Sequence, residues 1–177
     1  MLSKIPSEGD CIQLLHSYKV PQNVIDHSYK VLSVALKIAG KCNADIPLIT
    51  AGALLHDIGR SKTHGLFHAS YGADLLSGQG IPEPIVAVVR KHTGAGFTSD
   101  EARELNLPDA DYMPSTLEEK IVCHADNLVS GTNIVKSKDK INIELSKGHE
   151  STAGRIADMH KELSSLCGID IDMLLEN

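Results

Sequence analysis

The sequence is poor in aromatic residues: tryptophan is absent, and phenylalanine and tyrosine together make up only 3% of the 177 residues. Proteins that bind single-stranded nucleic acids commonly stack the bases on aromatic side chains, and this chain offers few of them. It also lacks an excess of positive charge, because its formal net charge is −6. We therefore expect no nucleic-acid partner. A phosphate-bearing ligand has to be held locally, by a metal ion or by a few placed cations.

The chain also lacks long apolar runs and paired cysteines. No run approaches the roughly 20 residues that cross a bilayer, and the first residues, MLSKIPSEGD, have no apolar stretch like that of a signal peptide. The four cysteines, Cys11, Cys42, Cys123 and Cys167, form no C-x-x-C pair. This excludes a thiolate zinc site and gives no disulfide framework. We expect reduced and mostly buried thiols in a cytoplasmic protein without a membrane partner.

Apolar residues recur at helical spacing over nearly the whole chain. Ser7 followed by Asp10 can open a first helix, and Ser115 with Glu118 forms a capping-box pattern before a later one. The spacing predicts helices over about residues 7–18, 21–40, 47–59, 68–77, 82–92, 116–130 and 151–167. The fold class that follows is all-α, in one domain.

Two segments depart from this pattern. Residues 93–114 form a long connection with one short helix expected after Asp100, and such length is typical of loops that cover a site. Residues 131–148 contain INIEL, which alternates like a strand but has lysines and aspartates around it. We expect an irregular hairpin or a short helix there. The last helix then has four apolar residues on one face: Ile156, Met159, Leu163 and Leu166.

A histidine and an aspartate, His56 and Asp57, lie in the most hydrophobic predicted helix, PLITAGALLHDIG. An unpaired aspartate in such surroundings costs several kcal/mol or becomes protonated. A cation must therefore compensate it, either an arginine or lysine or a metal ion. Adjacent positions on a helix differ by about 100°, so both side chains can reach one cleft between neighbouring helices.

The helices predicted around this central one each contribute a further histidine or aspartate. His27 lies inside the second helix and His68 opens the fourth. His92 closes the fifth helix, and Asp126 lies inside the sixth. Imidazole and carboxylate ligands without thiolate suit Fe, Mn, Co, Ni or Zn, and Mg can bind where carboxylates dominate. The pattern indicates a divalent metal as cofactor.

The order H…HD…H…H…D resembles the HD superfamily of metal-dependent phosphohydrolases. The elements that carry the resemblance are DHSYKVLSVALKIA, AGALLHDIGRSK, HASYGADLL, VVRKHTG and KIVCHADNLV, between Asp26 and Val129. Among small stand-alone members, the chain is similar to the bacterial symmetrical diadenosine tetraphosphate hydrolases, which share the His-Thr-Gly element and the KI…AD helix. It departs from them after Asp126, and its insertion over residues 95–113 is longer.

The resemblance implies a helical bundle with a five-helix core around a metal site. A single HD domain would occupy residues 1–177, with its core at about 21–130 and a helical extension at about 150–167. Carried over by position, two metal ions would have six ligands: His27, His56, Asp57, His68, His92 and Asp126. Asp57 would bridge the ions, with His68 and His92 completing the second site. Two such metals, roughly 3.5–4 Å apart, clamp a phosphate and activate water.

Five further residues are candidates for catalysis, substrate binding or ligand support beside the metal ions. Arg60 and Lys62 can bind phosphate, although solvated surface cations are the alternative. His64 can donate a proton to the leaving alkoxide, so we place it with Asp57 and Lys62 among the catalytic candidates. Thr93 and Asn127 are candidates for substrate contact, and Asn127 can instead support the ligands. We expect His124 to be structural or exposed, and three others to lie on the surface: His16, His149 and His160.

We therefore expect a metal-dependent phosphohydrolase acting on a nucleotide or nucleotide-like phosphate ester: a monophosphate, a dinucleoside polyphosphate or a cyclic phosphodiester. The partner is a small molecule, and a homodimer remains open. One alternative is an HD-type di-iron oxygenase, distinguished by its metal redox state and O₂ uptake. Another is a non-catalytic nucleotide sensor, which usually lacks some ligands, whereas this sequence has all six.

Overall fold

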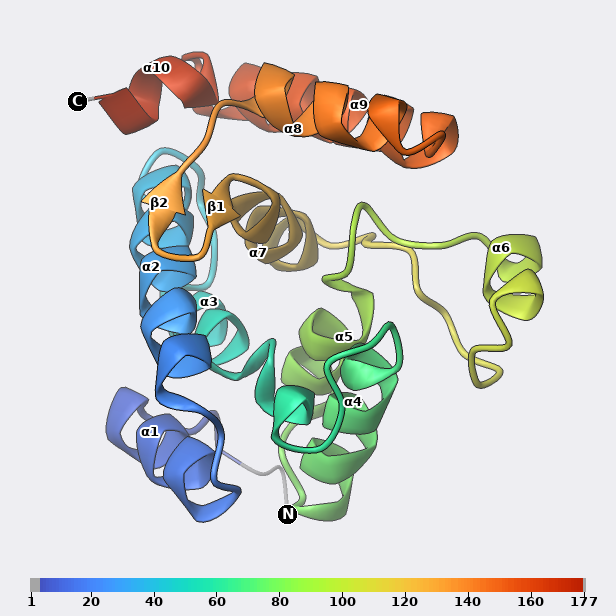
Figure 1. The fold of residues 1–177 in the computed structure, drawn as a ribbon. Helices are drawn as coiled ribbons and strands as arrows, with labels where there is room; N and C mark the ends of the chain where they lie inside the picture. The colour runs from blue at the N-terminus through green and yellow to red at the C-terminus, as the bar shows by residue number, and fades with distance from the viewer. Residues whose placement is uncertain (1–3, 177) are drawn as a thin grey trace.

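The computed structural model describes residues 4–176, which form ten α-helices, one 3-10 helix and a small hairpin. The α-helices are α1 (Glu8–Ser17), α2 (Gln22–Ala39), α3 (Ile46–Leu55), α4 (His68–Gly78), α5 (Glu83–Lys91), α6 (Ser99–Glu104), α7 (Leu117–Asn127), α8 (Ser137–Ser146), α9 (Glu150–Cys167) and α10 (Ile171–Glu176). The 3-10 helix is η1 (Ile58–Ser61), and β1 (Val129–Ser130) pairs antiparallel with β2 (Asn133–Ile134). The all-α prediction is confirmed (Figure 1). Among residues 4–176, no helix has the length and apolar character needed to cross a membrane.

Helix α3 is the centre of the fold, as its apolar sequence predicts. Seven of its ten residues are buried, and it packs against α1, α2, α5 and α7 (Figure 1). The contact with α5 is close, because a Cβ on Gly52 would lie 2.8 Å from Val88 Cγ1. A helix buried on every side can carry polar residues only at its ends. His56 follows its last residue directly.

The prediction of one helix over residues 47–59 is wrong at its C-terminal end. Helix α3 ends at Leu55, and Asp57 has φ −100° and ψ 13°, outside the α-helical region. The physical reason lies at Gly59, where an added Cβ would lie 1.9 Å from the carbonyl oxygen of His68. The chain leaves the helix so that η1 can pack directly on the start of α4. This break, and not a rotation along one helix, aims His56 and Asp57 in their different directions.

Glu119 links α5, which ends just before His92, to α7, which carries Asp126. The capping box of α7 uses Thr116 and Glu119, one position after the predicted pair; Glu118 instead accepts a hydrogen bond from the backbone N–H of Asp45. The Glu119 carboxylate also accepts from Lys91 Nζ, on α5, at 3.2 Å. The glutamate therefore fixes the start of α7 and the end of α5 relative to each other.

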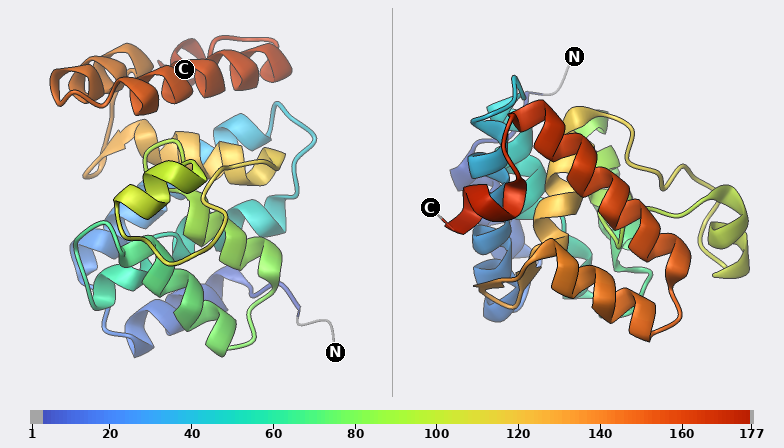
Figure 2. Two further views of the ribbon diagram at one scale, coloured as in Figure 1. Left: turned by 90° about the vertical axis from the view of Figure 1, so that its right-hand side faces the viewer. Right: turned by 90° about the horizontal axis from the view of Figure 1, so that it is seen from above.

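Segment 131–148 contains both elements that the sequence left open. A two-residue hairpin strand, β2, is followed by helix α8, which includes the INIEL sequence. The strand-like alternation therefore does not bury one face: Ile143 and Leu145 are 46% and 48% exposed. Helices α8 and α9 pack on each other, and α9 lies over α7 (Figures 1 and 2). Helix α10, which the sequence analysis did not predict, packs against α9 and α2.

In the last turn of α9, the side chain that faces the core is a cysteine. Leu166, expected on the buried face, is 57% exposed, whereas the Cys167 Sγ lies 2.9 Å from the Cys42 Sγ. All four cysteines are free thiols, and Cys11 and Cys123 are buried while Cys42 and Cys167 are partly exposed. Burial raises the pKa of the Cys11 thiol to about 12. Spacing along the sequence gave no sign that two distant cysteines meet.

The close contact at Gly59 predicts a large effect of a small substitution. Gly59→Ala should lower the free energy of unfolding by roughly 3 kcal/mol, because the neighbouring atoms belong to rigid backbone. Gly154→Ala is the matched control: a Cβ there meets nothing within 4 Å, and alanine in a helix is favoured over glycine by about 0.5–1 kcal/mol. Urea unfolding measures both. Equal stability of the two variants would contradict the close packing of η1 on α4.

The buried Glu119 predicts a pH-dependent contribution to stability. Burial opposes the charged carboxylate, but the N–H groups of Ser115 and Thr116 and the Lys91 ammonium outweigh it and hold the pKa of Glu119 below its usual value. Because the folded pKa is lowered, the stabilisation is complete above the unfolded pKa of about 4.3 and is lost as pH falls through the folded pKa. The stability difference between wild type and Glu119→Gln, measured by urea unfolding, should therefore be constant from pH 6 to 7. It should shrink below about pH 4, and a difference independent of pH would contradict this account.

Candidate metal centre

Four histidines and two aspartates meet at the ends of the core helices. His27 comes from α2, His56 follows α3, His68 begins α4, His92 follows α5, and Asp126 lies in α7, with Asp57 between α3 and η1. Three overlapping groups have ligand atoms within 4.8 Å of one another. They are His27 with His56 and Asp57, His56 with His92 and Asp126, and Asp57 with His68 and His92. The structure thus brings together all six residues that the sequence predicted as ligands.

Asp57 lies between the histidines of the two predicted metal sites. Its Oδ2 is 3.5 Å from His56 Nε2, and its Oδ1 is 3.1 Å from His68 Nε2 and 3.5 Å from His92 Nε2. The Asp126 Oδ1 lies on the other side, 2.9 Å from His27 Nε2 and 3.5 Å from His56 Nε2. His56, His92 and Asp57 are almost fully buried. The more exposed members are His27 and Asp126, with side chains 15% and 23% exposed, so the centre opens to solvent beside them.

Each of the four histidines is oriented by a backbone carbonyl group. The Nδ1 atoms of His27, His56, His68 and His92 lie 2.8, 2.8, 2.8 and 2.7 Å from the carbonyl oxygens of Gly131, Ala53, Gly65 and Val89. A carbonyl oxygen can only accept, so every Nδ1 carries the proton and donates it. Every Nε2 then presents a lone pair to the centre. This is the usual arrangement of a histidine that ligates a metal.

The nitrogen and oxygen atoms of the six residues would be better satisfied by a bound metal ion than they are by one another. His68 Nε2 and His92 Nε2 lie 3.0 Å apart, and two lone pairs at this distance repel unless a cation lies between or beside them. Within residues 4–176, His56 Nε2 and Asp57 Oδ1 are buried without a hydrogen-bond partner. Buried polar atoms without partners are costly. A divalent cation would give all of these atoms a partner, and nitrogen with carboxylate oxygen suits a transition metal.

The charges of the centre shift the pKa values of its members. Burial favours the neutral form of Asp57, yet the neighbouring His56, His68 and His92 hold its pKa well below the usual range. Burial likewise disfavours protonated His56, but the charges of Asp57 and Asp126 outweigh this and raise its pKa to about 9. The pKa of His92 is lowered, chiefly by burial. Without a metal, His56 therefore takes up a proton at neutral pH, and metal ion and proton compete for the same nitrogen.

The cations predicted to bind phosphate have partners at the edge of the centre. Arg60 Nε donates to Asp57 Oδ2 at 2.6 Å, and its Nη1 donates to the His64 carbonyl oxygen. Lys62 Nζ lies over the ring of Tyr71, 4.8 Å from its centroid, and the side chain of His64 is in an exposed position. Arg60 thus contacts a metal-ligand candidate, whereas no contact joins Lys62 or His64 to the cluster within residues 4–176. Their catalytic and phosphate-binding roles stay predictions.

Thr93 and Asn127 differ in what they contact. The amide of Asn127 donates to the carbonyl oxygens of Gly94 and Cys123, so it ties α7 to the segment that follows His92. This geometry agrees with the supporting role left open for Asn127. The Thr93 hydroxyl is buried and has no partner within residues 4–176.

Two of the remaining histidines, His124 and His160, form a pair outside the set of six predicted ligands. His124 is fully buried, and its Nε2 lies 3.0 Å from His160 Nδ1. Burial lowers the pKa of His124 to about 3, so it is neutral at physiological pH. The prediction of a surface position is wrong for His160, whose side chain is only 14% exposed; His16 and His149 are exposed as predicted. The error arose because α10, which brings Asp170 to His160, was not predicted.

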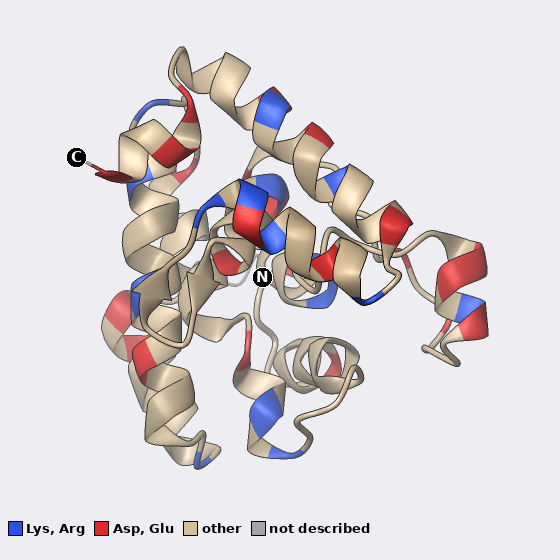
Figure 3. Cartoon of the chain, turned by 45° about the horizontal axis from the view of Figure 1, so that its top comes forward, with Lys and Arg blue, Asp and Glu red and all other residues tan. Residues whose placement is uncertain are grey.

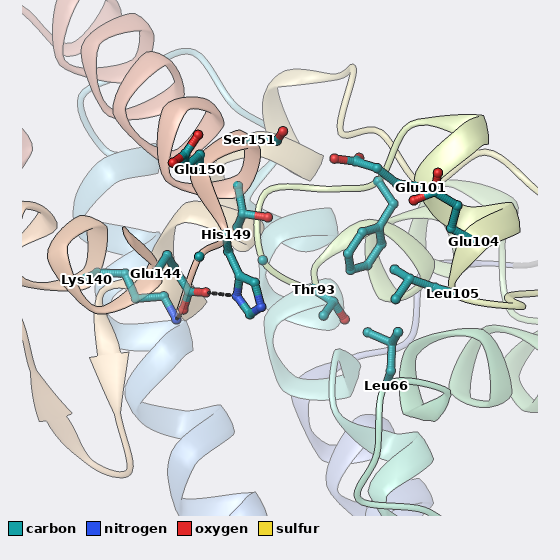
Figure 4. A pocket seen from close by; sticks show the side chains of 14 residues that line it. Leu66, Thr93, Glu101, Glu104, Leu105, Lys140, Glu144, His149, Glu150 and Ser151 are labelled. Carbon is teal, nitrogen blue, oxygen red and sulfur yellow. Dashed lines mark hydrogen bonds and ion pairs between the residues drawn. The ribbon is translucent and has the colours of Figure 1, made fainter. Parts of the chain in front are cut away.

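Sequence reasoning missed a pocket next to the centre. It has a volume of about 650 Å³ and is lined by segment 93–105 and by residues 140–152, with Leu66 at its base (Figure 4). Its lining includes Thr93 and Gly94, which directly follow His92. The length of segment 93–114 predicted a cover over a site, but α8 and the start of α9 carried no signal for a role beside it.

Comparison with known sequences places these observations in a family. The HD domain family matches residues 24–131. A tRNA (cytidine(56)-2'-O)-methyltransferase of Thermoplasma volcanium is 48% identical over 168 residues, covering 95% of this chain and 50% of the relative. An uncharacterized protein of Methanocaldococcus jannaschii is 44% identical over 154 residues, covering 82% of this chain and 90% of the relative. The chain spans about half the length of the methyltransferase relatives it matches.

More distant similarities are shorter or concern the fold alone. A ribonuclease Y of Pseudothermotoga lettingae is 33% identical over 75 residues, covering 41% of this chain and 15% of the relative. The HD domain of the L. monocytogenes phosphodiesterase PgpH, solved in complex with cyclic-di-AMP, superposes with a TM-score of 0.55 and 21% identity, covering 88% of this chain and 96% of that one. The finer resemblance to diadenosine tetraphosphate hydrolases stays a prediction. With the family matching more than half of the sequence and the fold agreeing, the chain belongs to the HD domain family.

Proposed function

We propose that this protein is a phosphoric-ester hydrolase that uses two divalent metal ions and acts on a nucleotide or nucleotide-like phosphate ester. The observation that carries the proposal is the convergence of four imidazole Nε2 lone pairs on the carboxylates of Asp57 and Asp126. A site of this kind binds cations and attracts the oxygen atoms of a phosphate only once its own negative charges are neutralised. Metal-assisted hydrolysis is the reaction class that needs this arrangement.

In this proposal the ligands divide between two ions that share Asp57. His27, His56, Asp57 and Asp126 would hold one ion, and Asp57, His68 and His92 would hold the other. When bound, such ions supply positive charge for the phosphate oxygens and an activated water at neutral pH. The native ions belong to the set Fe, Mn, Co, Ni or Zn, with Mg as an alternative.

In this proposal, residues of the chain orient the imidazole ligands, hold Asp57 in place and bind the substrate. The backbone carbonyls hold each imidazole in one tautomer, so that no ligand has to reorganise when substrate arrives. Arg60, at 2.6 Å from Asp57, keeps one Asp57 oxygen in place. The partial exposure of His27 and Asp126 marks the side from which a substrate approaches. In this proposal Lys62 and His64 act at the rim, binding phosphate and donating a proton to the leaving oxygen.

Some of the relatives support the proposal of phosphate-ester hydrolysis more directly than others. Ribonuclease Y and the PgpH phosphodiesterase bear names that denote cleavage of phosphodiesters. The methyltransferase relatives are about twice as long as the matched region, and this region carries the His/Asp cluster. We therefore assign methyl transfer in those proteins to the part outside the match. For this chain we propose a small-molecule substrate rather than RNA, because its net charge is −6.

Two other functions of the same site lead to different measurements. A di-iron oxygenase would consume O₂ and change the redox state of its iron during turnover. A non-catalytic nucleotide sensor would bind ligand without turnover, yet it would not need the two carboxylates and four imidazoles that meet here. A panel of phosphate mono- and diesters with Mn²⁺, Fe²⁺, Co²⁺, Ni²⁺ and Mg²⁺, run with an oxygen electrode, separates all three.

The shared position of Asp57 predicts the effect of its removal. Asp57→Ala should abolish phosphohydrolase activity and most metal content while the helical far-UV spectrum is kept, because both ions lose their common anionic ligand. Asp74→Asn, an exposed aspartate on α4, is the control and should behave like the wild type. An Asp57→Ala protein that retains more than a small fraction of turnover would refute the proposed mechanism.

The division of ligands predicts the metal content. The wild type should bind about two ions per chain and the His68→Ala, His92→Ala double variant about one, as elemental analysis will show. The double variant should also lose most of its kcat at saturating substrate. Chelation should lower the melting temperature of the wild type, because the metal joins ligands from different helices. One ion in both proteins, with only KM affected, would leave a one-metal enzyme.

A further inference from the structure

The pocket described above begins where the metal centre ends. Thr93 and Gly94, in its lining, directly follow His92, and Leu66 precedes His68 by two residues. Successive Cα atoms are about 3.8 Å apart, so the base of the pocket lies within one or two residues of two ligand candidates. The Asn127 amide holds the Gly94 carbonyl and thereby fixes this border to α7, which carries Asp126. Part of the pocket lining is thus adjacent along the chain to His68 and His92.

The walls of the pocket carry an excess of negative charge. Four glutamates and one lysine line it: Glu101, Glu104, Glu144, Glu150 and Lys140. Glu101 pairs with Arg155, and Glu144 is paired with Lys140 and His149. Glu104 and Glu150 have no ion-pair partner within residues 4–176. Figure 3 shows acidic segments on α6 and at the start of α9, the elements on which these two glutamates lie. A second phosphate group placed here would meet like charge.

One part of the lining is apolar and contains an aromatic ring. Phe97 lines the pocket together with Leu66 and Leu105, and Figure 4 shows these two leucines across from His149 and Glu144. The Phe97 ring is supported from behind by Tyr112, with the ring centroids 6.5 Å apart. A planar ring can stack on Phe97 while its hydroxyl or amino groups meet the glutamates.

We propose that this pocket binds the nucleoside part of the substrate and restricts the enzyme to nucleotides with a single phosphate at the point of attachment. The volume of about 650 Å³ lies within the range of small-molecule sites. The aromatic and apolar wall takes the base, and the carboxylates of Glu101 and Glu144 accept hydrogen bonds from its amino group and from the sugar hydroxyls. Glu104 and Glu150, which have no ion-pair partner within residues 4–176, repel the further phosphates of a triphosphate or polyphosphate. This inference rests on the proposed function for the position of the phosphate.

The first experiment measures selectivity. With p-nitrophenyl phosphate used to establish phosphohydrolase activity, kcat/KM is determined for AMP and ATP at a fixed concentration of free Mn²⁺. The wild type should prefer AMP. The Glu104→Gln, Glu150→Gln double variant should raise kcat/KM for ATP about tenfold and leave that for AMP within about twofold, because it removes only the repulsion. The Asp139→Asn, Asp158→Asn double variant removes the same charge from exposed positions of α8 and α9 outside the pocket lining and should leave the ratio unchanged.

The second experiment measures binding without metal or turnover. Adenosine is titrated calorimetrically into the wild type, Phe97→Ala and Phe97→Tyr in the presence of EDTA. Phe97→Ala should weaken binding at least fivefold, as expected for loss of a stacked ring at about 1–3 kcal/mol. Phe97→Tyr, which keeps the ring, should bind like the wild type.

The outcomes distinguish the pocket from the proposed function. Hydrolysis of p-nitrophenyl phosphate with equal or greater activity on ATP than on AMP would overturn the pocket proposal and leave the hydrolase intact. An identical change in the AMP-to-ATP ratio of kcat/KM in the two double variants would also overturn the pocket proposal and leave the hydrolase intact. Absence of hydrolysis with every metal would overturn the proposed function, and adenosine binding that depends on the Phe97 ring would then still support a nucleoside site. Failure of adenosine to bind the wild type overturns the pocket proposal.

Discussion

Four imidazole Nε2 atoms face two carboxylates in a largely buried space, an arrangement that a cation would stabilise. The His68 and His92 lone pairs are 3.0 Å apart, and His56 Nε2 and Asp57 Oδ1 have no hydrogen-bond partner within residues 4–176. No apolar core of this size would tolerate such a cluster without compensation. The helices around α3 thus each contribute one candidate metal ligand to this cluster.

The main chain determines where the ligands lie. Carbonyl groups three residues before His56, His68 and His92, and that of Gly131 for His27, fix the tautomer of each histidine. Glu119 joins α5 to α7, and Asn127 joins α7 to the segment after His92. These residues touch no metal ligand atom, yet their hydrogen bonds determine the relative placement of helices that carry the ligands. The rigid support is what allows partially desolvated charges to remain close without collapse.

Much of this could be predicted from the sequence, and the failures have local causes. Helical spacing gave the core helices, and the HD motif order gave all six residues that meet. Capping preferences predicted a start for α7 one residue too early, because Ser115 and Thr116 are both good caps and tertiary contact with Lys91 selects Glu119. The end of α3 was missed because the break depends on packing between Gly59 and α4. The pocket was missed because its walls come from segments about 50 residues apart, which periodicity alone does not bring together.

The backbone contact between Gly59 and His68 has a consequence for metal choice. Because η1 lies directly on the first turn of α4, the backbone next to Asp57 and the backbone that carries His68 are held together. Ions of larger or smaller radius must be accommodated by rotation of the Asp57 carboxylate and by small tilts of the imidazole rings, not by helices sliding apart. A metal bound at this centre would therefore be selected by its coordination geometry and preferred bond length.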